Sequence, residues 1–173
     1  SKSVNCSGSE ERGAVNMKLL IKQRVFSWTD TYDVYDESGN VKYFVKAEFL
    51  SIGHRIHVYD TENQEVGMIK EKVITLLPVF EIEGAGIRGR IEKKLSFLKP
   101  KYQVDFNGWQ IKGDFLAWNY EVTDKRGEAA ARITKEPLHW GDTYVIDYQD
   151  PADELMTLLL VIAIDAANCS GEG

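Results

Sequence analysis

The residues best suited to bind a charged ligand form a basic stretch in the middle of the chain. Between Met68 and Lys112 the sequence has nine basic and five acidic residues, although the chain as a whole carries a net charge of −6. The most closely spaced cations are Arg88, Arg90, Lys93, Lys94, Lys99 and Lys101. Clustered cations attract anionic headgroups, at about 1 kcal/mol for each one near a membrane. These six residues are the predicted anion- or lipid-binding site, and the alternative is an ordinary solvated outer wall.

No other set of side chains has the spacing of a catalytic or metal site. The candidates are His54, His57, His139, Cys6 and Cys169. The first two histidines are three residues apart, which places them on opposite faces of a strand, and the cysteines lack partners at ligand spacing. The chain has no Gly-x-Ser-x-Gly motif, and segment 36–40 lacks the alternating ligands of an EF-hand. The sequence therefore predicts no catalytic residue, no metal and no cofactor.

Composition limits the class of protein further. The chain has 173 residues and ordinary hydrophobic and charged fractions, which are typical of a single globular domain. Its negative net charge argues against a general nucleic-acid-binding protein. Residues 1–16 are polar and without periodicity, as in a disordered leader or a remnant of expression, and 170–173 form a tail. We expect a cytoplasmic protein with one domain over 17–169, which could also be peripheral at a membrane.

The segment from Asp150 to Asn168 predicts a buried helix. Asp150 can cap the helix, Pro151 suits its first position, and nine apolar residues then follow with almost no polar interruption. A helix that is apolar all round must be enclosed. The run is shorter than the roughly 20 residues of a membrane span, so a helix over 151–167 inside the protein is favoured over a membrane anchor.

The rest of the chain repeats with a period of about 20–24 residues. Each repeat contains an aromatic or isoleucine residue two positions before a β-branched one, which is the alternation of a half-buried strand. Examples are Tyr32 and Val34, Ile56 and Val58, Phe80 and Ile82, Tyr102 and Val104, Tyr120 and Val122, and Tyr144 and Ile146. A second strand precedes each, and turn residues such as Asn107-Gly108 separate the units. The sequence therefore predicts a mainly β fold, a closed twelve-stranded antiparallel barrel of six hairpins around the C-terminal helix.

Three details of this barrel remain open from the sequence. Glu71 and Lys93 fall on the inner face of the strand pattern, which indicates either a bulge or a mixed face near one mouth. Asp165 either contacts a polar group inside the barrel or emerges at its far mouth. Large apolar turn residues gather at one mouth, where they either plug the barrel or form a binding surface. These are Trp28, Ile52, Leu76, Leu77, Phe97, Leu98, Trp118 and Trp140, and plugging is favoured.

Several repeat segments resemble the LURP-one-related proteins. They read K-A-E-F-L-S-I-G, K-K-L-S-F-L-K-P-K-Y, G-D-F-L-A-W-N-Y and P-L-H-W-G-D-T-Y, followed by L-V-I-A-I-D-A-A-N, and the resemblance covers 17–168. It implies a fold related to the Tubby C-terminal domain and to phospholipid scramblases, again a twelve-stranded barrel around a helix. It implies little about activity, because fold does not determine function.

These observations favour a non-enzymatic binding or tethering module. Its expected partner is an anionic, phosphoinositide-like membrane lipid or another protein, with no nucleic acid and no transmembrane span. The alternative is an intracellular scaffold or a small-molecule-binding barrel with no membrane role.

Overall fold

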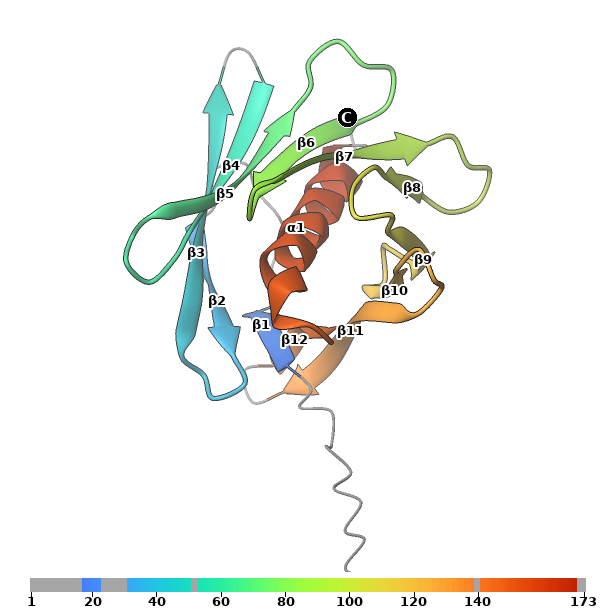
Figure 1. Ribbon diagram of the computed structural model, residues 1–173. Coiled ribbons are helices and arrows are strands. Elements are labelled where there is room, and N and C mark those ends of the chain that lie inside the picture. The colour runs from blue at the N-terminus through green and yellow to red at the C-terminus, as the bar shows by residue number, and fades with distance from the viewer. Residues whose placement is uncertain (1–16, 23–30, 51–52, 139–140, 171–173) are drawn as a thin grey trace, which may run out of the picture.

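The computed structural model describes residues 17–22, 31–50, 53–138 and 141–170. Within these ranges the chain forms twelve strands and one C-terminal helix (Figure 1). The strands are β1 (Met17–Lys22), β2 (Thr31–Asp36), β3 (Val41–Leu50), β4 (Gly53–Tyr59), β5 (Glu65–Glu71), β6 (Val79–Gly84), β7 (Ile87–Lys94), β8 (Lys101–Val104), β9 (Gln110–Asp114), β10 (Asn119–Thr123), β11 (Ala129–Leu138) and β12 (Gly141–Tyr148). The predicted leader, the end of the tail, Trp28, Ile52, His139 and Trp140 lie outside the described residues.

The predicted antiparallel barrel around a C-terminal helix is confirmed, with one correction. Each strand pairs with its neighbours in the chain, and β1 pairs with β12, so the sheet runs in the order β8 through β1, then β12 through β9. No hydrogen-bonded ladder joins β8 to β9, and the barrel is therefore nearly closed rather than closed. These two strands are short, with four and five residues.

Three hairpin turns at one end of the barrel are built in the same way. The side chains of Asp36, Asp60 and Asp124 each accept hydrogen bonds from the backbone N–H groups two and four residues later. A residue with positive φ follows three positions after each aspartate, and two of these are Gly39 and Gly127. Aspartate and glycine satisfy these requirements at low cost. The repeated turn chemistry explains why the repeat in the sequence becomes a repeat of hairpins.

Alternation along the strands fills the barrel. The inward-facing residues predicted from the pattern, such as Val34, Ile56, Ile69 and Ile82, are buried together with the helix. Helix α1 (Glu154–Ser170) follows a 3₁₀ turn (Pro151–Asp153) that is capped by the side chain of Asp150. Residues 158–164 of α1 are essentially inaccessible to solvent, so the prediction of an enclosed apolar helix is confirmed. The regular helix begins three residues later than expected because the first turn is 3₁₀.

The helix lies closest to the β5–β6–β7 side of the barrel. Here Gly67 and Gly84 face each other across β5 and β6, and Leu159 packs against both. A Cβ atom at either glycine would lie 2.8 Å from a terminal carbon of Leu159. Two glycines are therefore needed where the leucine side chain meets the wall.

Side chains close the seam between β8 and β9 where the backbone does not. The Tyr102 hydroxyl donates to the Oδ1 atom of Asn168, and the Asn168 amide donates to the carbonyl oxygen of Phe115 at 3.2 Å. The Tyr102 and Phe115 rings also meet edge to face, with 5.1 Å between centroids. Nearby, Lys99 and Asp114 form an ion pair at 3.3 Å. The end of the helix thus links the two sheet edges that lack a shared ladder.

The questions left open by the sequence have structural answers. Glu71 is the last residue of β5 and pairs with His54, and Lys93 lies next to the end of β7, so the inner face becomes polar near the mouth. The strand pairs β5–β6 and β7–β8 contain no bulge. Asp165 is partly exposed. The pKa values of Tyr102 and Tyr120 are raised chiefly by burial, with a further contribution from the negative charge of Asp165.

Candidate functional site

The six predicted site residues fall into two groups. Arg88 and Arg90 lie on the outer wall along β7, while Lys93 and Lys94 end that strand. Lys99 lies in the connection to β8, and Lys101 begins β8. The fold therefore brings the four lysines together at one end of the barrel and leaves the two arginines farther along the wall.

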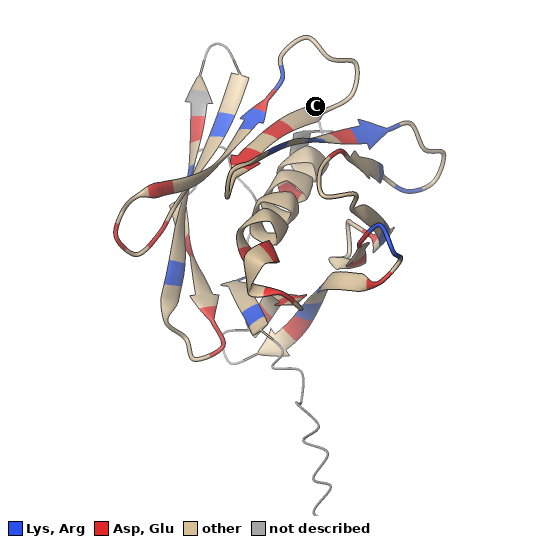
Figure 2. Cartoon of the chain, viewed as in Figure 1, with Lys and Arg blue, Asp and Glu red and all other residues tan. Residues whose placement is uncertain are grey.

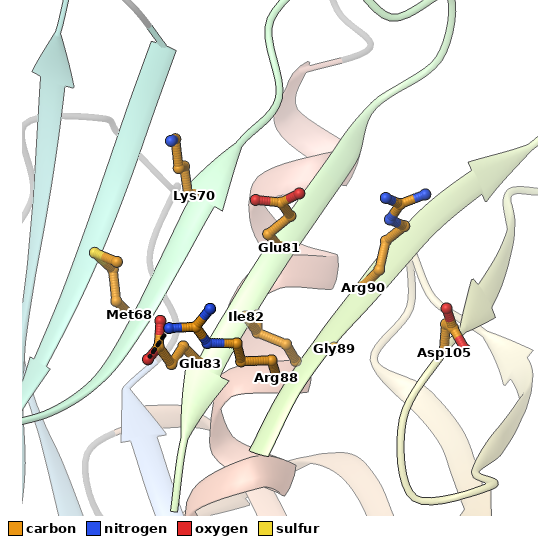
Figure 3. Close-up of a pocket in the computed structure, with 9 residues that line it drawn as sticks. All are labelled: Met68, Lys70, Glu81, Ile82, Glu83, Arg88, Gly89, Arg90 and Asp105. Carbon is orange, nitrogen blue, oxygen red and sulfur yellow. Dashed lines mark hydrogen bonds and ion pairs between the residues drawn. The ribbon is translucent and has the colours of Figure 1, made fainter. Parts of the chain in front are cut away.

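The two arginines line a shallow groove of about 540 Å³ on the outer wall (Figure 3). Its lining includes three cations and three acids, which are Lys70, Arg88, Arg90, Glu81, Glu83 and Asp105. Arg88 pairs with Glu83 at 3.3 Å, and Arg90 pairs with Glu92 at 3.2 Å. The balance of charge and these pairs make the groove a poor match for an anion. Arg88 and Arg90 are therefore arranged as in an ordinary solvated outer wall, where cations pair with neighbouring acids.

A different surface stands out at the end of the barrel reached by β5 and β7. The β5–β6 loop (72–78) and the β7–β8 loop (95–100) carry Ile74, Leu76, Leu95, Phe97 and Leu98, each at least 82% exposed. Val73 in the first loop and Leu116 in the β9–β10 turn are more than half exposed as well. We call this surface the apolar end. Contiguous exposed apolar side chains on this scale usually mark an interaction site.

The preference for a plugged mouth is therefore wrong for the described loops that carry Leu76, Phe97 and Leu98. Among the mouth residues that the structure describes, Trp118 is the buried one and stacks on the ring of Tyr144, while Leu77 is partly buried. These loops lie beyond the ends of β5 and β7, and the side chains of Leu76, Phe97 and Leu98 are exposed to solvent.

The tip of the β5–β6 loop is also strained. Ile74 has a φ angle of 64° and is fully exposed. A β-branched residue in this left-handed region is unfavourable by roughly 1–3 kcal/mol, and such strain is concentrated at functional sites. No packing inside the barrel compensates for it, because the side chain points into solvent.

Lysines surround the apolar end. A groove of about 490 Å³ lies between its two loops, with Leu76 and Leu95 on its sides and Lys93 and Lys94 among its lining residues. Lys94 is directly opposite Lys101 across the β7–β8 ladder, an arrangement of like charges that destabilises a sheet. Among the described residues, Lys93 and Lys101 have no ion-pair partner. A bound anion would relieve this repulsion.

Three other cationic contacts at this end are weak surface pairs. They join Lys72 to Glu81, Lys94 to Glu92 and Lys99 to Asp114, over 2.7–3.4 Å. Exposed pairs of this kind contribute about 0–1 kcal/mol. They leave these lysines available to a stronger anionic ligand.

The opposite end of the barrel is acidic. It carries the turns that begin at Asp36, Asp60 and Asp124, together with Asp150 and Asp153 beside the helix N-terminus. Hydrogen bonds from the backbone N–H groups of Asn40 and Glu128 are the main cause of the lowered pKa values of Asp36 and Asp124. Figure 2 shows acidic positions on these turns and basic positions near the end of β7. Acidic residues therefore outnumber basic ones at this end, which also carries Lys125 and Arg126.

The described residues contain no group of three metal-ligating side chains. The most buried carboxylate among them is Glu154, and it is satisfied by Lys42, Tyr43 and Tyr148. Its three donors hold it as an anion at the start of α1, which is a structural role. In the described chain no helix is both long and apolar enough to span a bilayer.

This architecture defines a class: a nearly closed twelve-stranded barrel that encloses its own C-terminal helix, with exposed loops at one end. The LURP-one-related family model matches residues 17–165, and the chain belongs to that family. The chain is 29% identical over 150 residues to the uncharacterised protein YxjI of Bacillus subtilis strain 168, covering 86% of this chain and 92% of the relative. It is also similar to an X-ray structure of an Arabidopsis thaliana protein, with a TM-score of 0.59 and 14% identity over 88% of this chain and 92% of the other.

The family assignment brings no molecular activity with it, and neither the family name nor the relative's name denotes an enzyme. Sequence reasoning found part of the candidate surface and missed Val73, Ile74, Leu95 and Leu116. Val73 and Leu95 continue the apolar alternation of the preceding strands in the sequence, yet β5 and β7 end before them and both side chains are exposed. The available signal was the charge at Glu71 and Lys93, each two residues earlier on the same face.

Proposed function

We propose that this LURP-one-related domain is a non-enzymatic binding module that docks on the anionic lipid surface of a membrane. The observation that carries the proposal is the apolar end, where exposed apolar loops and five lysines occupy the same part of the barrel. A bilayer presents the complementary pair of features, which are anionic headgroups above an apolar interior.

The charge arrangement supports this choice of partner. Lys93 and Lys101 are available for headgroups, and Lys94 gains from an anion that separates it from Lys101. Arg88 and Arg90 belong to the outer flank of the predicted site and act at longer range, since Glu83 and Glu92 already pair with them. Their contribution is correspondingly sensitive to salt.

The cytoplasmic leaflet is the membrane surface that best fits the proposal, because it is the one enriched in anionic lipid. The domain therefore acts as a peripheral module on that surface. A protein partner with an acidic, apolar surface is the competing occupant of the same end, and the experiment below separates the two.

Vesicle co-sedimentation tests the proposal. The native domain is mixed at low salt with vesicles of neutral phosphatidylcholine or of phosphatidylcholine with anionic lipid. We expect pelleting only with the anionic vesicles. The double variant Lys93→Gln/Lys101→Gln should bind roughly thirtyfold more weakly, from about 1 kcal/mol for each lysine. The matched control is Lys125→Gln, at the acidic end, which should bind as the native domain does.

Two results would contradict the lipid proposal. One is the absence of pelleting with anionic vesicles at low salt, which would leave the apolar end to a protein partner. The other is equal loss of binding in the Lys125→Gln control, which would show that only overall charge matters.

A further inference from the structure

We infer that docking is end-on and penetrating: the β5–β6 and β7–β8 loops enter the apolar layer of the membrane, with the axis of α1 close to the membrane normal. The inference rests on the proposed function and adds the mode of binding. It distinguishes insertion of apolar side chains from adsorption of a charged wall.

The distribution of apolar surface gives the first argument. Among the described residues, every large hydrophobic side chain that is more than half exposed lies at the apolar end. These are Val73, Ile74, Leu76, Leu95, Phe97, Leu98 and Leu116. The other exposed large hydrophobic side chains in the described chain are Val41, Phe44 and Leu138, and each is less than half exposed. Val41 begins β3 at the acidic end, Phe44 lies within β3, and Leu138 ends β11. Insertion is therefore favourable at one end and has no counterpart on the side of the barrel.

The position of the lysines gives the second argument. Lys72 and Lys99 lie in the penetrating loops beside the apolar side chains, and Lys94 and Lys101 lie at the strand ends behind the tips. When the tips enter the apolar layer, long lysine side chains at this level reach the headgroups while their stems remain against apolar surface. The order of residues along the loop thus matches the order of layers in a membrane.

The third argument concerns the rest of the molecule. The groove that contains Arg88 and Arg90 has balanced charge, so the side wall is not attracted strongly to an anionic surface. The acidic turns are repelled by it. Helix α1 begins at the acidic end, where Glu154 meets Tyr43, and finishes near the apolar end, where Asn168 meets Tyr102 (Figure 1). If the acidic end stays far from the membrane, the axis of α1 therefore lies close to the membrane normal.

Depth-dependent fluorescence quenching tests this geometry. An environment-sensitive dye is attached at Phe97→Cys or, as the control at the acidic end, at Thr61→Cys, in a background carrying Cys6→Ser and Cys169→Ala. The vesicles contain anionic lipid and a nitroxide placed either on the headgroup or deep in the acyl chain. We expect the deep nitroxide to quench the dye at position 97 and neither nitroxide to quench the dye at position 61.

A salt-resistance measurement supplies the second readout. The native domain should retain part of its vesicle binding in about 1 M salt, where the Debye length is about 3 Å and charge attraction is screened. Phe97→Asp should reduce that residual binding at least tenfold. Burying one phenylalanine side chain in the apolar layer of the membrane contributes enough free energy to change the binding constant by more than a factor of ten. Val41→Asp at the acidic end is the matched control and should change it little. Near-UV circular dichroism checks that both variants are folded.

The outcomes separate this inference from the proposed function. Binding at low salt that is lost completely in high salt, with a dye at position 97 that only the headgroup nitroxide quenches, overturns penetration and leaves lipid binding intact. Quenching at position 61 as strong as at position 97 overturns the end-on orientation. Absence of low-salt binding defeats the proposed function itself.

Discussion

Glu154 provides the sharpest test of how the helix is held in the barrel. This first residue of α1 is 8% exposed, and its carboxylate accepts hydrogen bonds from three donors. These are Lys42 Nζ at 2.7 Å, the Tyr43 hydroxyl at 2.5 Å and the Tyr148 hydroxyl. Two come from β3 and one from β12, so one side chain joins the helix to two separated parts of the wall.

The variant Glu154→Gln preserves the size of this side chain and removes its charge. Hydrogen bonds to a charged group contribute about 1.5–3 kcal/mol, against 0.5–1.5 kcal/mol for neutral ones, so three weakened bonds amount to roughly 2–4 kcal/mol. The new amide N–H also has no acceptor in the Lys42 ammonium, although the two tyrosine hydroxyls can accept from it. For a domain of this size the loss lowers Tm by about 5–15 °C. Urea unfolding and thermal melting at pH 7 measure it.

The pH dependence identifies the carboxylate as the cause. Burial alone would raise the pKa of Glu154, but hydrogen bonds from Lys42, Tyr148 and Tyr43 outweigh it and lower the pKa below its usual value. A lowered folded-state pKa contributes stability that is fully present above the unfolded pKa of about 4.3 and disappears as the pH falls through the folded value. The stability difference between the native domain and Glu154→Gln should therefore be largest near neutral pH and shrink below about pH 4.

The control is Glu62→Gln, in an exposed turn, which should leave stability within about 0.5 kcal/mol of the native value. Glu154→Gln as stable as the native domain at pH 7 would refute the anchoring argument. So would a loss that stays constant on acidification, because it would indicate disturbed packing and not a lost charge.

Three further substitutions test the core and the seam. Leu159→Asp should cost more than about 4 kcal/mol and unfold the domain, since it buries an unpaired charge; Leu116→Asp on the exposed turn should leave the melting curve unchanged. Gly84→Ala should cost about 1–3 kcal/mol by crowding Leu159, and a double-mutant cycle should show a smaller cost in a Leu159→Ala background. Asn168→Ala should cost about 1–3 kcal/mol and speed hydrogen exchange in β8 and β9 more than in β3 and β4, whereas uniform acceleration would contradict its role at the seam.

The fold was predictable because two periodicities are strong and agree. Alternation over pairs such as Ile56 and Val58 fixes which face of each strand is inside, and the unbroken apolar run near Leu159 requires an enclosure. These are local signals that each element carries in its own residues, so tertiary contacts did not have to be known.

The seam and the exact composition of the site were not predictable in the same way. Whether β8 pairs with β9 depends on the lengths and twist of ten other strands, and no residue in either strand records it. Asn168 looks like a helix-ending residue in the sequence, yet its two hydrogen bonds reach Tyr102 and Phe115, which lie 66 and 53 residues away. The neutralisation of Arg88 likewise depends on cross-strand register, which sets Glu83 opposite Arg88.

The location of the loops relative to the anchors bears on how docking can work. Glu154 holds α1 to the wall at the acidic end, and Asn168 holds it across the seam beside the apolar end. The strands that support the β5–β6 loop pack directly on this fixed helix, since Leu159 touches Gly67 of β5 and Gly84 of β6. Exposed apolar tips therefore extend from a rigid support, and their solvent exposure is already present before any partner arrives. Binding then requires little reordering of the barrel, which keeps its entropic cost low. Weakening either anchor should consequently reduce membrane binding less than it reduces stability.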